Sequence, residues 1–335
     1  MHIIVTGGLG FIGSNFIRFI LNETEDIFIT NIDAQTYAGN PENLKDIEKN
    51  KNYHYVKGRI QDYDFIENLF KKYQSDVVIN FAAETHVDRS IKLAQPFIET
   101  NIIGTHVLLE LALKNNLKRY IQISTDEVYG SIEPPNKFTE TSLIKPNSPY
   151  SASKASADHL VRAYNKTYGL HTTTIRCSNN FGPYQYPEKV IPYFISLALE
   201  NNNVPIYGDG LNIRDWIYVE DFCSAISLIL KKGKSGEVYN VGGESEMTNL
   251  DLTKLLLKKL GKPESLLQFV KDRPGHDRRY AMDCTKIKKE LGWKRKYDFD
   301  SALDKTIEWY KKNSDWINKR TNEKWLIAHG ESLQK

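Results

Sequence analysis

The chain has 335 residues, more than one hydrophobic core ordinarily fills, so we expect two domains or one domain with an added lobe. Hydrophobic residues make up 40% and charged residues 26%, a globular composition that excludes disordered, collagen-like and coiled-coil chains. The net charge of +3 is too small to indicate a nucleic-acid partner.

The three cysteines, Cys177, Cys223 and Cys284, are odd in number and widely spaced. They fit neither a disulfide scaffold nor a set of paired metal ligands, which favours a reducing compartment. Glycines and polar residues interrupt the apolar N-terminal segment, so it predicts neither a signal peptide nor a membrane span. We therefore expect a cytoplasmic protein with no membrane partner and no metal site.

Short β-rich segments alternate with helical patterns through the first half of the chain. The expected strands are residues 3–6, 27–32, 53–56, 77–81 and 120–124, and the expected helices include residues 14–21, 96–115 and 150–168. Such alternation predicts an α/β fold, a Rossmann-like doubly wound parallel sheet with helices on both faces. Ligands of such sheets bind outside the carboxyl ends of the strands.

The second half of the chain changes in character. Residues 179–214 are rich in Asn, Pro, Gly and Tyr, with one helix at 191–200, and strands at 215–219 and 238–241 are expected to return to the sheet. Short helices are predicted at 250–260, 285–291 and 301–311. We expect a first domain of residues 1–178 with 215–245, a smaller, partly discontinuous C-terminal substrate lobe of residues 179–214 and 246–320, and a polar tail at 321–335.

Three glycines follow the first expected strand. Gly7, Gly10 and Gly13 form GxxGxxG, where one glycine permits a tight turn, one lets the backbone approach a pyrophosphate, and one allows close packing of helix on strand. The helix that follows offers unpaired N–H groups to phosphates. The pattern alone also occurs in ordinary turns, but its place between a strand and a helix predicts a dinucleotide site.

An acidic residue ends the second expected strand. Asp33 lies twenty residues past Gly13, where a carboxylate accepts both ribose hydroxyls and repels a 2′-phosphate. No Arg or Lys follows until Lys45, so the predicted cofactor is NAD and not NADP. The alternative is that Asp33 only caps a loop.

Tyr150 and Lys154 form a YxxxK pattern at the start of an expected helix, where residues four apart share one face. A nearby ammonium stabilises a phenolate, so Tyr150 is a candidate base for a hydroxyl proton. Tyr53 and Lys57 match the same pattern, but they fall on an expected strand, where they lie about 13 Å apart. The alternative is a surface Tyr and Lys on an amphipathic helix.

Thr125, Asp126 and Glu127 directly follow the fifth expected strand. Adjacent carboxyls repel each other unless one keeps its proton, which is the arrangement that an acid–base pair needs. Both side chains reach one substrate only if the chain turns here, and Gly130 makes a turn plausible. The alternative is that both carboxyls belong to a solvated loop.

The segments TGGLGFIGS, AAETHVDRS, STDEVYG, PYSASKAS, RCSNNFGPYQYPEK, YGDGLNIRDW and DRPGHDRRYA resemble the extended short-chain dehydrogenase/reductase superfamily. Within it, the chain is most similar to the dTDP-glucose 4,6-dehydratases, from Met1 to about Tyr310. The segments STDEVYG and DRPGHDRRY carry the finer resemblance, because similar sugar-nucleotide epimerases generally lack the Asp-Glu pair.

The resemblance implies a lyase with an internal redox cycle on a nucleoside-diphosphate glucose, and a place in rhamnose biosynthesis. Tyr150 takes the hydroxyl proton at carbon 4 while hydride passes to NAD. Glu127 then removes the proton at carbon 5, and Asp126 protonates the hydroxyl that leaves carbon 6. Hydride returns to carbon 6 and gives the 4-keto-6-deoxy sugar, in a site that must stay closed.

The resemblance also assigns binding residues by motif. Cofactor contacts with NAD are implied for Gly7, Gly10, Phe11, Ile12, Gly13, Asp33, Ala34, Gln35, Thr36, Arg59, Ile60, Phe81, Ala82, Ala83, Thr100, Tyr150, Lys154 and Asn180. Contacts with the nucleotide sugar are implied for Thr85, Thr125, Asn179, Lys189, Val190, Pro205, Ile206, Tyr207, Arg214, Asn249, Arg273 and His276. Guanidinium groups suit a diphosphate, although either arginine alone also fits a surface ion pair, and His276 an ordinary loop.

One position departs from the family. Arg59 stands where the family usually has an acidic residue that contacts the adenine. A guanidinium has no acceptor for the adenine amino hydrogens, so either Arg59 stacks on the base or Asp62 takes over the contact.

The expected helices at 96–115 and 150–168 bear on assembly. Apolar residues wrap more than one face of the first, namely Ile98, Ile102, Ile103, Val107, Leu108, Leu109 and Leu111, and Ala152, Ala155 and Ala157 on the second allow close helix approach. The pattern and the resemblance predict a homodimer through a four-helix interface. The alternative is that loops of the same chain cover the extra face.

Two other functions stay open. One is a 4-epimerase, or a 4,6-dehydratase of another nucleotide sugar such as a UDP-linked one. The other is a non-catalytic NAD-binding sensor, since a fold does not determine a function. The base of the nucleotide is undecided, because one methyl group is worth only about 1–3 kcal/mol in a pocket.

Overall fold

Seven parallel strands form the central sheet of the computed structural model, which describes residues 1–321. Their order across the sheet is β10 (Glu237–Val241), β6 (Thr172–Cys177), β5 (Arg119–Thr125), β4 (Val77–Asn80), β1 (His2–Thr6), β2 (Phe28–Asp33) and β3 (Tyr53–Lys57). The chain order reverses between β1 and β4, and ligands bind at such a switch point. The predicted doubly wound Rossmann-like sheet is confirmed.

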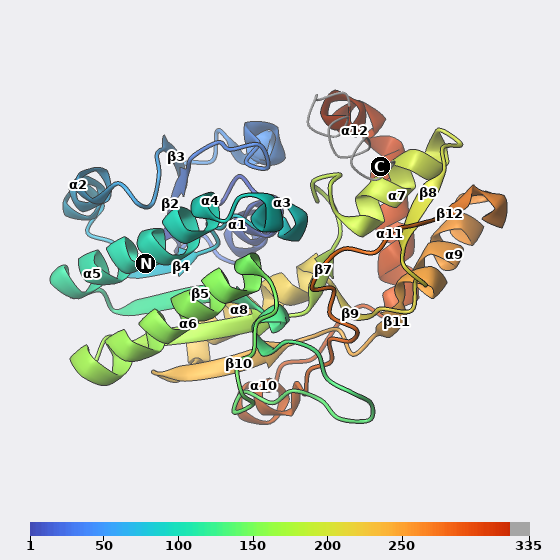
Figure 1. Ribbon diagram of the computed structural model, residues 1–335. Coiled ribbons are helices and arrows are strands. Elements are labelled where there is room, and N and C mark those ends of the chain that lie inside the picture. The colour runs from blue at the N-terminus through green and yellow to red at the C-terminus, as the bar shows by residue number, and fades with distance from the viewer. Residues whose placement is uncertain (322–335) are drawn as a thin grey trace.

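Helices cover both faces of this sheet (Figure 1). On one face α1 (Phe11–Glu23) packs against α8 (Val219–Lys232), and on the other α2 (Tyr63–Tyr73), α5 (Thr105–Lys114) and α6 (Pro149–Tyr168) pack in turn. Each face buries its own cluster of aliphatic and aromatic side chains, which is the main source of stability in such a layered fold.

Local signals set the start of α6. Ser148 and Ser151 form a reciprocal capping box, and Pro149 occupies the first turn. Tyr150 and Lys154 therefore lie one turn apart on one helix, whereas the similar pair Tyr53 and Lys57 lies at the two ends of strand β3, as predicted.

A second group of elements lies beside the sheet (Figure 1). It contains a three-stranded sheet of β7 (Asn179–Phe181), β9 (Ile213–Tyr218) and β11 (Glu246–Thr248), and a parallel pair, β8 (Val204–Tyr207) and β12 (Leu267–Val270). The helices α7 (Val190–Leu199), α9 (Asn249–Leu260), α11 (Phe299–Lys312) and α12 (Ser314–Thr321) belong to it. Its buried cluster is separate from the two sheet clusters and includes Phe181, Ile195, Leu256 and Tyr310.

The remaining described elements are shorter. They are η1 (Pro41–Ile47), α3 (Val87–Lys92), α4 (Gln95–Phe97), the π-helix η2 (Ile98–Gly104), η3 (Asp126–Tyr129), η4 (Glu264–Leu266) and α10 (Thr285–Leu291). The helix expected at 96–115 is thus divided into α4, η2 and α5. Within residues 1–321, no helix has the length and apolar character needed to cross a lipid bilayer.

Two expectations about strands need correction. The segment near Asp215 was expected in the central sheet, which is wrong: β9 pairs with β7 and β11 instead, while residues 238–241 do return to it as β10. Strand β6 was not predicted, because its sequence TTTIRC lacks a long apolar run although every residue in it is buried. The residue boundaries of the two parts stay a prediction, and the tail from residue 322 lies outside the described residues.

Candidate active site

The glycine-rich turn between β1 and α1 is built for close backbone approach. Gly7 has a φ of +70°, and a Cβ on it would lie 2.6 Å from the backbone nitrogen of Ala82 on the neighbouring strand end. A Cβ on Gly13 would lie 2.5 Å from the carbonyl oxygen of Gly7. No side chain caps the start of α1 at Gly10, which leaves the N–H groups of the first turn available for an anion.

Asp33 ends β2 beside this turn and is only 7% exposed. Its two carboxylate oxygens accept the backbone N–H groups of Leu9 (2.9 Å) and Gln35 (2.8 Å). Burial nevertheless raises the pKa of Asp33, and the two hydrogen bonds act in the opposite direction. The carboxylate both braces the glycine turn and lines the adjacent cavity.

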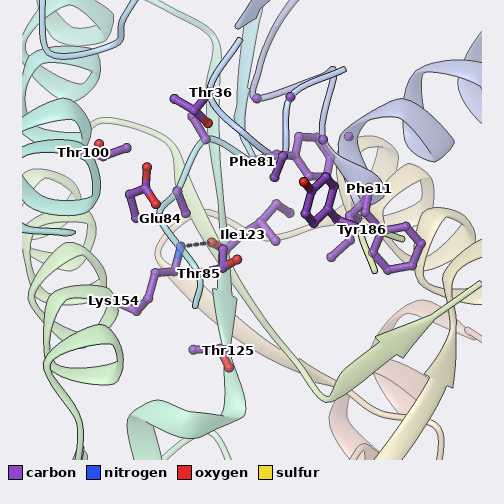
Figure 2. Close-up of a pocket in the computed structure, with 18 of the residues that line it drawn as sticks. Phe11, Thr36, Phe81, Glu84, Thr85, Thr100, Ile123, Thr125, Lys154 and Tyr186 are labelled. Atoms are coloured by element: carbon purple, nitrogen blue, oxygen red, sulfur yellow. Dashed lines mark hydrogen bonds between the residues drawn. The ribbon is translucent and has the colours of Figure 1, made fainter. Parts of the chain in front are cut away.

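A cavity of about 290 Å³ opens at the carboxyl ends of β1, β2, β4 and β5 (Figure 2). In this view Thr100, Glu84 and Lys154 lie on one side of it, and Phe11, Phe81 and Tyr186 on the other. The predicted cofactor residues that line it are Gly7, Gly10, Phe11, Ile12, Gly13, Asp33, Ala34, Thr36, Arg59, Ile60, Phe81, Ala82, Ala83, Thr100, Tyr150, Lys154 and Asn180. Gln35 is not among the lining residues; it has a φ of +51° and its N–H binds Asp33.

The residues near the expected adenine contact differ in whether they line the first cavity. Arg59 and Gln61 both line the cavity. Asp62 does not; its carboxylate accepts the N–H of Phe65 at 3.1 Å and caps α2. The alternative that Asp62 replaces the family's acidic residue gains no support from this placement and stays a prediction.

The carboxyl pair follows β5 in a single turn of 3₁₀-helix, η3. The Thr125 side-chain oxygen accepts the N–H of Glu127 at 3.2 Å, its hydroxyl lies 3.2 Å from the Oδ1 atom of Asp126, and Gly130 ends the turn with a φ of +80°. The expected turn is present, and it lets both carboxyl groups line the same cavity.

The two carboxyls differ in their electrostatic surroundings. Burial, together with the charges of Glu127 and Asp215, raises the pKa of Asp126 well above its ordinary value. Its Oδ2 atom is buried and has no hydrogen-bond partner among the described residues. Burial raises the pKa of Glu127 as well, but three cations, Arg273, Arg214 and Lys189, act against the rise. Asp126 is thus the group that keeps a proton and Glu127 the group that loses it more readily.

Tyr150 and Lys154 line the cavity from α6 and are both buried. The Lys154 ammonium donates to the carbonyl oxygen of Ile123 at 2.7 Å (Figure 2), and burial lowers the pKa of this lysine. Burial and the charge of Glu127 raise the pKa of Tyr150 well above its ordinary value, while a hydrogen bond with Thr125 acts in the opposite direction. Loss of hydration therefore dominates the pKa of this phenol, and the expected stabilisation of its ionised form by Lys154 stays a prediction.

A second cavity of about 520 Å³ lies between the central sheet and the second group of elements. The predicted substrate residues that line it are Thr85, Asn179, Lys189, Val190, Pro205, Ile206, Tyr207, Arg214, Asn249, Arg273 and His276. Thr125 lines the first cavity instead. The two cavities adjoin each other and share part of their lining. The residues that line both are Thr85, Glu127, Asn179, Asn180, Gln185, Glu188 and Lys189.

The two arginines of this second cavity differ, since Arg214 is buried without a salt bridge among the described residues, whereas Arg273 is half-buried in an ion pair. Arg214 is 5% exposed, its guanidinium carbon lies 4.1 Å from the ring centre of Tyr280, and it donates to the backbone carbonyls of Ile213 and Asp277. Arg273 lies 3.2 Å from the Asp88 carboxylate. Burial and the two arginines lower the pKa of His276 to about 4, so this ring is neutral at pH 7, and its Nδ1 atom donates to the Asp272 carboxylate at 2.7 Å. The net positive field suits a diphosphate.

Several lining residues were not predicted as site residues. The second cavity adds Asp88, Tyr193, Trp216 and Tyr280, and the first adds Glu84, Gln185, Tyr186 and Glu188. Tyr186 and Glu188 stand in the segment RCSNNFGPYQYPEK, which already carried the resemblance, so their proximity to Asn180 and Lys189 was the available signal. Glu84 and Asp88 likewise stand in the segment AAETHVDRS, whereas nothing local in the sequence marks Tyr193.

Comparison with known proteins agrees with this geometry. The family model described as GDP-mannose 4,6 dehydratase matches residues 4–306. A dTDP-glucose 4,6-dehydratase of Salmonella typhimurium is 48% identical, with all of both chains covered. The chain belongs to the dTDP-glucose 4,6-dehydratase family.

Two solved structures of this dehydratase family have closely similar folds. The Bacillus anthracis dTDP-glucose 4,6-dehydratase in complex with NAD is 49% identical, with a TM-score of 0.90 and coverage of 95% of this chain and 99% of that one. DesIV of Streptomyces venezuelae, with NAD and TYD bound, is 44% identical, with a TM-score of 0.92 and coverage of 94% and 98%.

The residues present fit the dinucleotide expected of a dTDP-glucose 4,6-dehydratase. The glycine turn would clash with added Cβ atoms, the first turn of α1 lacks a side-chain cap, and Asp33 lines the same cavity. These are the elements that hold a pyrophosphate and a ribose in a Rossmann-like domain.

Proposed function

We propose that the protein is an NAD-dependent hydro-lyase that converts dTDP-glucose to its 4-keto-6-deoxy product. The observation that carries this proposal is the adjacent pair of buried Asp126 and half-buried Glu127 in the wall of the first cavity. Acidic neighbours add to the rise that burial causes in the pKa of Asp126, whereas three cations act against the rise in the pKa of Glu127. A simple dehydrogenase or a 4-epimerase has no elimination step and no use for such a pair. Membership of the dehydratase family supports the same substrate.

Each protein group has a defined task in this reaction. Tyr150 removes the hydroxyl proton at carbon 4, assisted by the positive charge of Lys154 one turn along α6 and oriented by Thr125. Bound NAD accepts the hydride of carbon 4 and later returns it to carbon 6. The carbonyl at carbon 4 acidifies the proton at carbon 5, which Glu127 removes while Asp126 gives its proton to the hydroxyl leaving carbon 6. Arg214 and Arg273 bind the diphosphate.

A label at carbon 4 tests the proposal directly. Substrate tritiated at carbon 4 should give a 4-keto product whose tritium resides at carbon 6, because the hydride is returned one position further out. The product is isolated and degraded chemically, and the tritium at each carbon is counted. Tritium retained at carbon 4 of a fully hydroxylated sugar would instead establish epimerisation, and no label transfer at all would support a non-catalytic NAD-binding protein. The same assay with UDP-linked sugars ranks the alternative bases.

We also propose a homodimer whose interface includes α3, η2 and α6. Ile98, Ile103 and Leu93 are 48%, 45% and 60% exposed, and η2 contacts α6, whose Ala152 is exposed. Val107 and Leu109, further along the helix expected at 96–115, are buried within the chain. The exposed apolar residues of that expected helix therefore lie in its first turns.

Charged substitutions test this interface. The double variant Ile98→Glu and Ile103→Glu should shift the sedimentation mass from two chains to one, because two carboxylates would be buried without partners. Phe269→Glu, at a 58% exposed position on β12, is the control and should leave the mass unchanged. A monomeric wild-type protein would rule the dimer out.

A further inference from the structure

A hydrogen bond joins two walls of the cofactor cavity. The Tyr37 hydroxyl donates to the Oε1 atom of Glu188 at 3.2 Å, across 151 positions of sequence. Tyr37 stands in the loop that follows β2 and Asp33, and Glu188 stands just before α7. The bond therefore connects the cofactor-binding side of the molecule with the substrate side.

Residues next to both partners line the cavity. Thr36 and Ala38 flank Tyr37, and Gln185 and Tyr186 precede Glu188; all four line it, as does Glu188 itself. Tyr186 also meets Tyr37 edge to face, with ring centres 5.6 Å apart. The contact thus lies at the cavity wall, where the two loops come together, and not on a remote surface.

Charged groups hold both partners in place. The guanidinium of Arg89 lies 4.2 Å from the ring centre of Tyr37, a distance typical of a cation–π contact. The Glu188 side chain is 2% exposed and lies 3.7 Å from Lys189, which donates to the carbonyl oxygen of Thr85 at 2.9 Å. Glu188, Lys189 and Thr85 all line the substrate cavity too, so this contact borders both ligands.

The reaction makes retention of the cofactor essential. If the reduced dinucleotide leaves between the two hydride transfers, the sugar is left as a dead-end ketone or enone and the enzyme is left without its oxidant. We propose that Tyr37 is a positioning residue whose hydrogen bond to Glu188 closes the cofactor cavity and keeps NADH bound through the catalytic cycle. This inference rests on the proposed function for its purpose, but the contact itself does not depend on the substrate.

Tyr37→Phe tests the proposal, because it removes one hydroxyl and keeps the ring that Arg89 and Tyr186 contact. The holoenzyme variant should release NADH about 10- to 100-fold faster than wild type, the effect of losing one hydrogen bond to a charged group. Release is measured without sugar, by dilution of NADH-loaded protein into an NADH-consuming reporter enzyme. With dTDP-glucose, the variant should begin at a rate near that of wild type, decay over successive turnovers, and recover when NAD is added.

The controls separate this role from a merely structural one. Tyr53→Phe removes a hydroxyl that accepts a hydrogen bond from Asn31 and does not line either cavity, so it should leave NADH release unchanged. Glu188→Gln tests the same bond from the other side and should also speed NADH release, with less than additive effect in the double variant. If Tyr37→Phe releases NADH no faster than the wild-type protein does, the proposal is wrong. If the variant releases NADH faster but the wild-type protein forms no 4-keto product, the proposed reaction is refuted, while the proposed role of Tyr37 in holding NADH is supported.

Discussion

Asp126→Asn should slow product formation by about 10²- to 10⁴-fold while leaving the first oxidation intact, because the amide cannot give a proton to the departing hydroxyl. The substitution keeps the shape of a fully buried side chain, so the fold should be unaffected. Mixing the holoenzyme variant with dTDP-glucose should therefore produce bound NADH at the wild-type rate, followed by its slow consumption. Rapid-scan absorbance measures both phases.

The pH dependence gives a second readout of the same residue. Asp126 acts only while protonated and Glu127 only while ionised, so wild-type turnover should fall as pH rises through the raised Asp126 pKa and fall again as pH drops through the Glu127 pKa. In Asp126→Asn the alkaline fall should vanish. Asp221→Asn, which alters a buried carboxyl bonded to backbone N–H groups outside both cavities, is the matched control. Unchanged turnover in Asp126→Asn would remove Asp126 as the acid.

Lys154→Met should block the reaction one step earlier. In the proposed reaction, the positive charge of the buried Lys154 favours ionised Tyr150, whose pKa is raised by burial and by the charge of Glu127. Its removal should slow the reduction of bound NAD by about 10²- to 10⁴-fold and weaken NAD binding, so no NADH phase should appear. Single-turnover absorbance and NAD titration measure the two effects.

Stability should not account for this loss. Methionine has a similar length and needs no hydration, so replacing a desolvated ammonium should leave the melting temperature near or above that of wild type. Lys166→Met, an exposed position further along α6, should change neither property. Normal NADH formation in Lys154→Met would show that the phenol needs no help from this lysine.

The two variants together order the catalytic steps. Asp126→Asn should stop after the first hydride transfer, and Lys154→Met before it. A protein that only binds NAD would show neither pattern, and an epimerase would tolerate the loss of Asp126. The pair therefore distinguishes the proposed function from both alternatives.

Short-range patterns predicted the parts of this molecule that local chemistry decides. The glycine turn needs glycines because added Cβ atoms would meet backbone at Gly7 and Gly13, and α6 begins where Ser148 and Pro149 stand. Asp126 and Glu127 are neighbours in the chain, and the turn that Gly130 suggested lets the charge of Glu127 add to the rise that burial causes in the pKa of Asp126.

The sequence was a poor guide to which strands pair with each other over long distances in the chain. Strand β6 was not predicted because threonine usually lies on protein surfaces. Thr172, Thr173 and Thr174 are buried because β6 pairs with β5 on one side and with β10 on the other. Strand β9 was placed in the wrong sheet, because its residues suit a buried strand in either. Periodicity shows that a segment is a strand, but not which strand lies beside it.

By itself, the sequence determined the class of fold, the dinucleotide turn, the family and the candidate acid–base pair, because each depends on short motifs and on their order along the chain. Only the tertiary structure decided which carboxyl keeps its proton and which side chains complete the cavities. Those properties arise from burial and from charges brought together over long distances in the chain, such as Arg273 beside Glu127 and Tyr37 against Glu188. Electrostatic energy depends on separation in space and on exclusion of water, and neither quantity is written in local sequence.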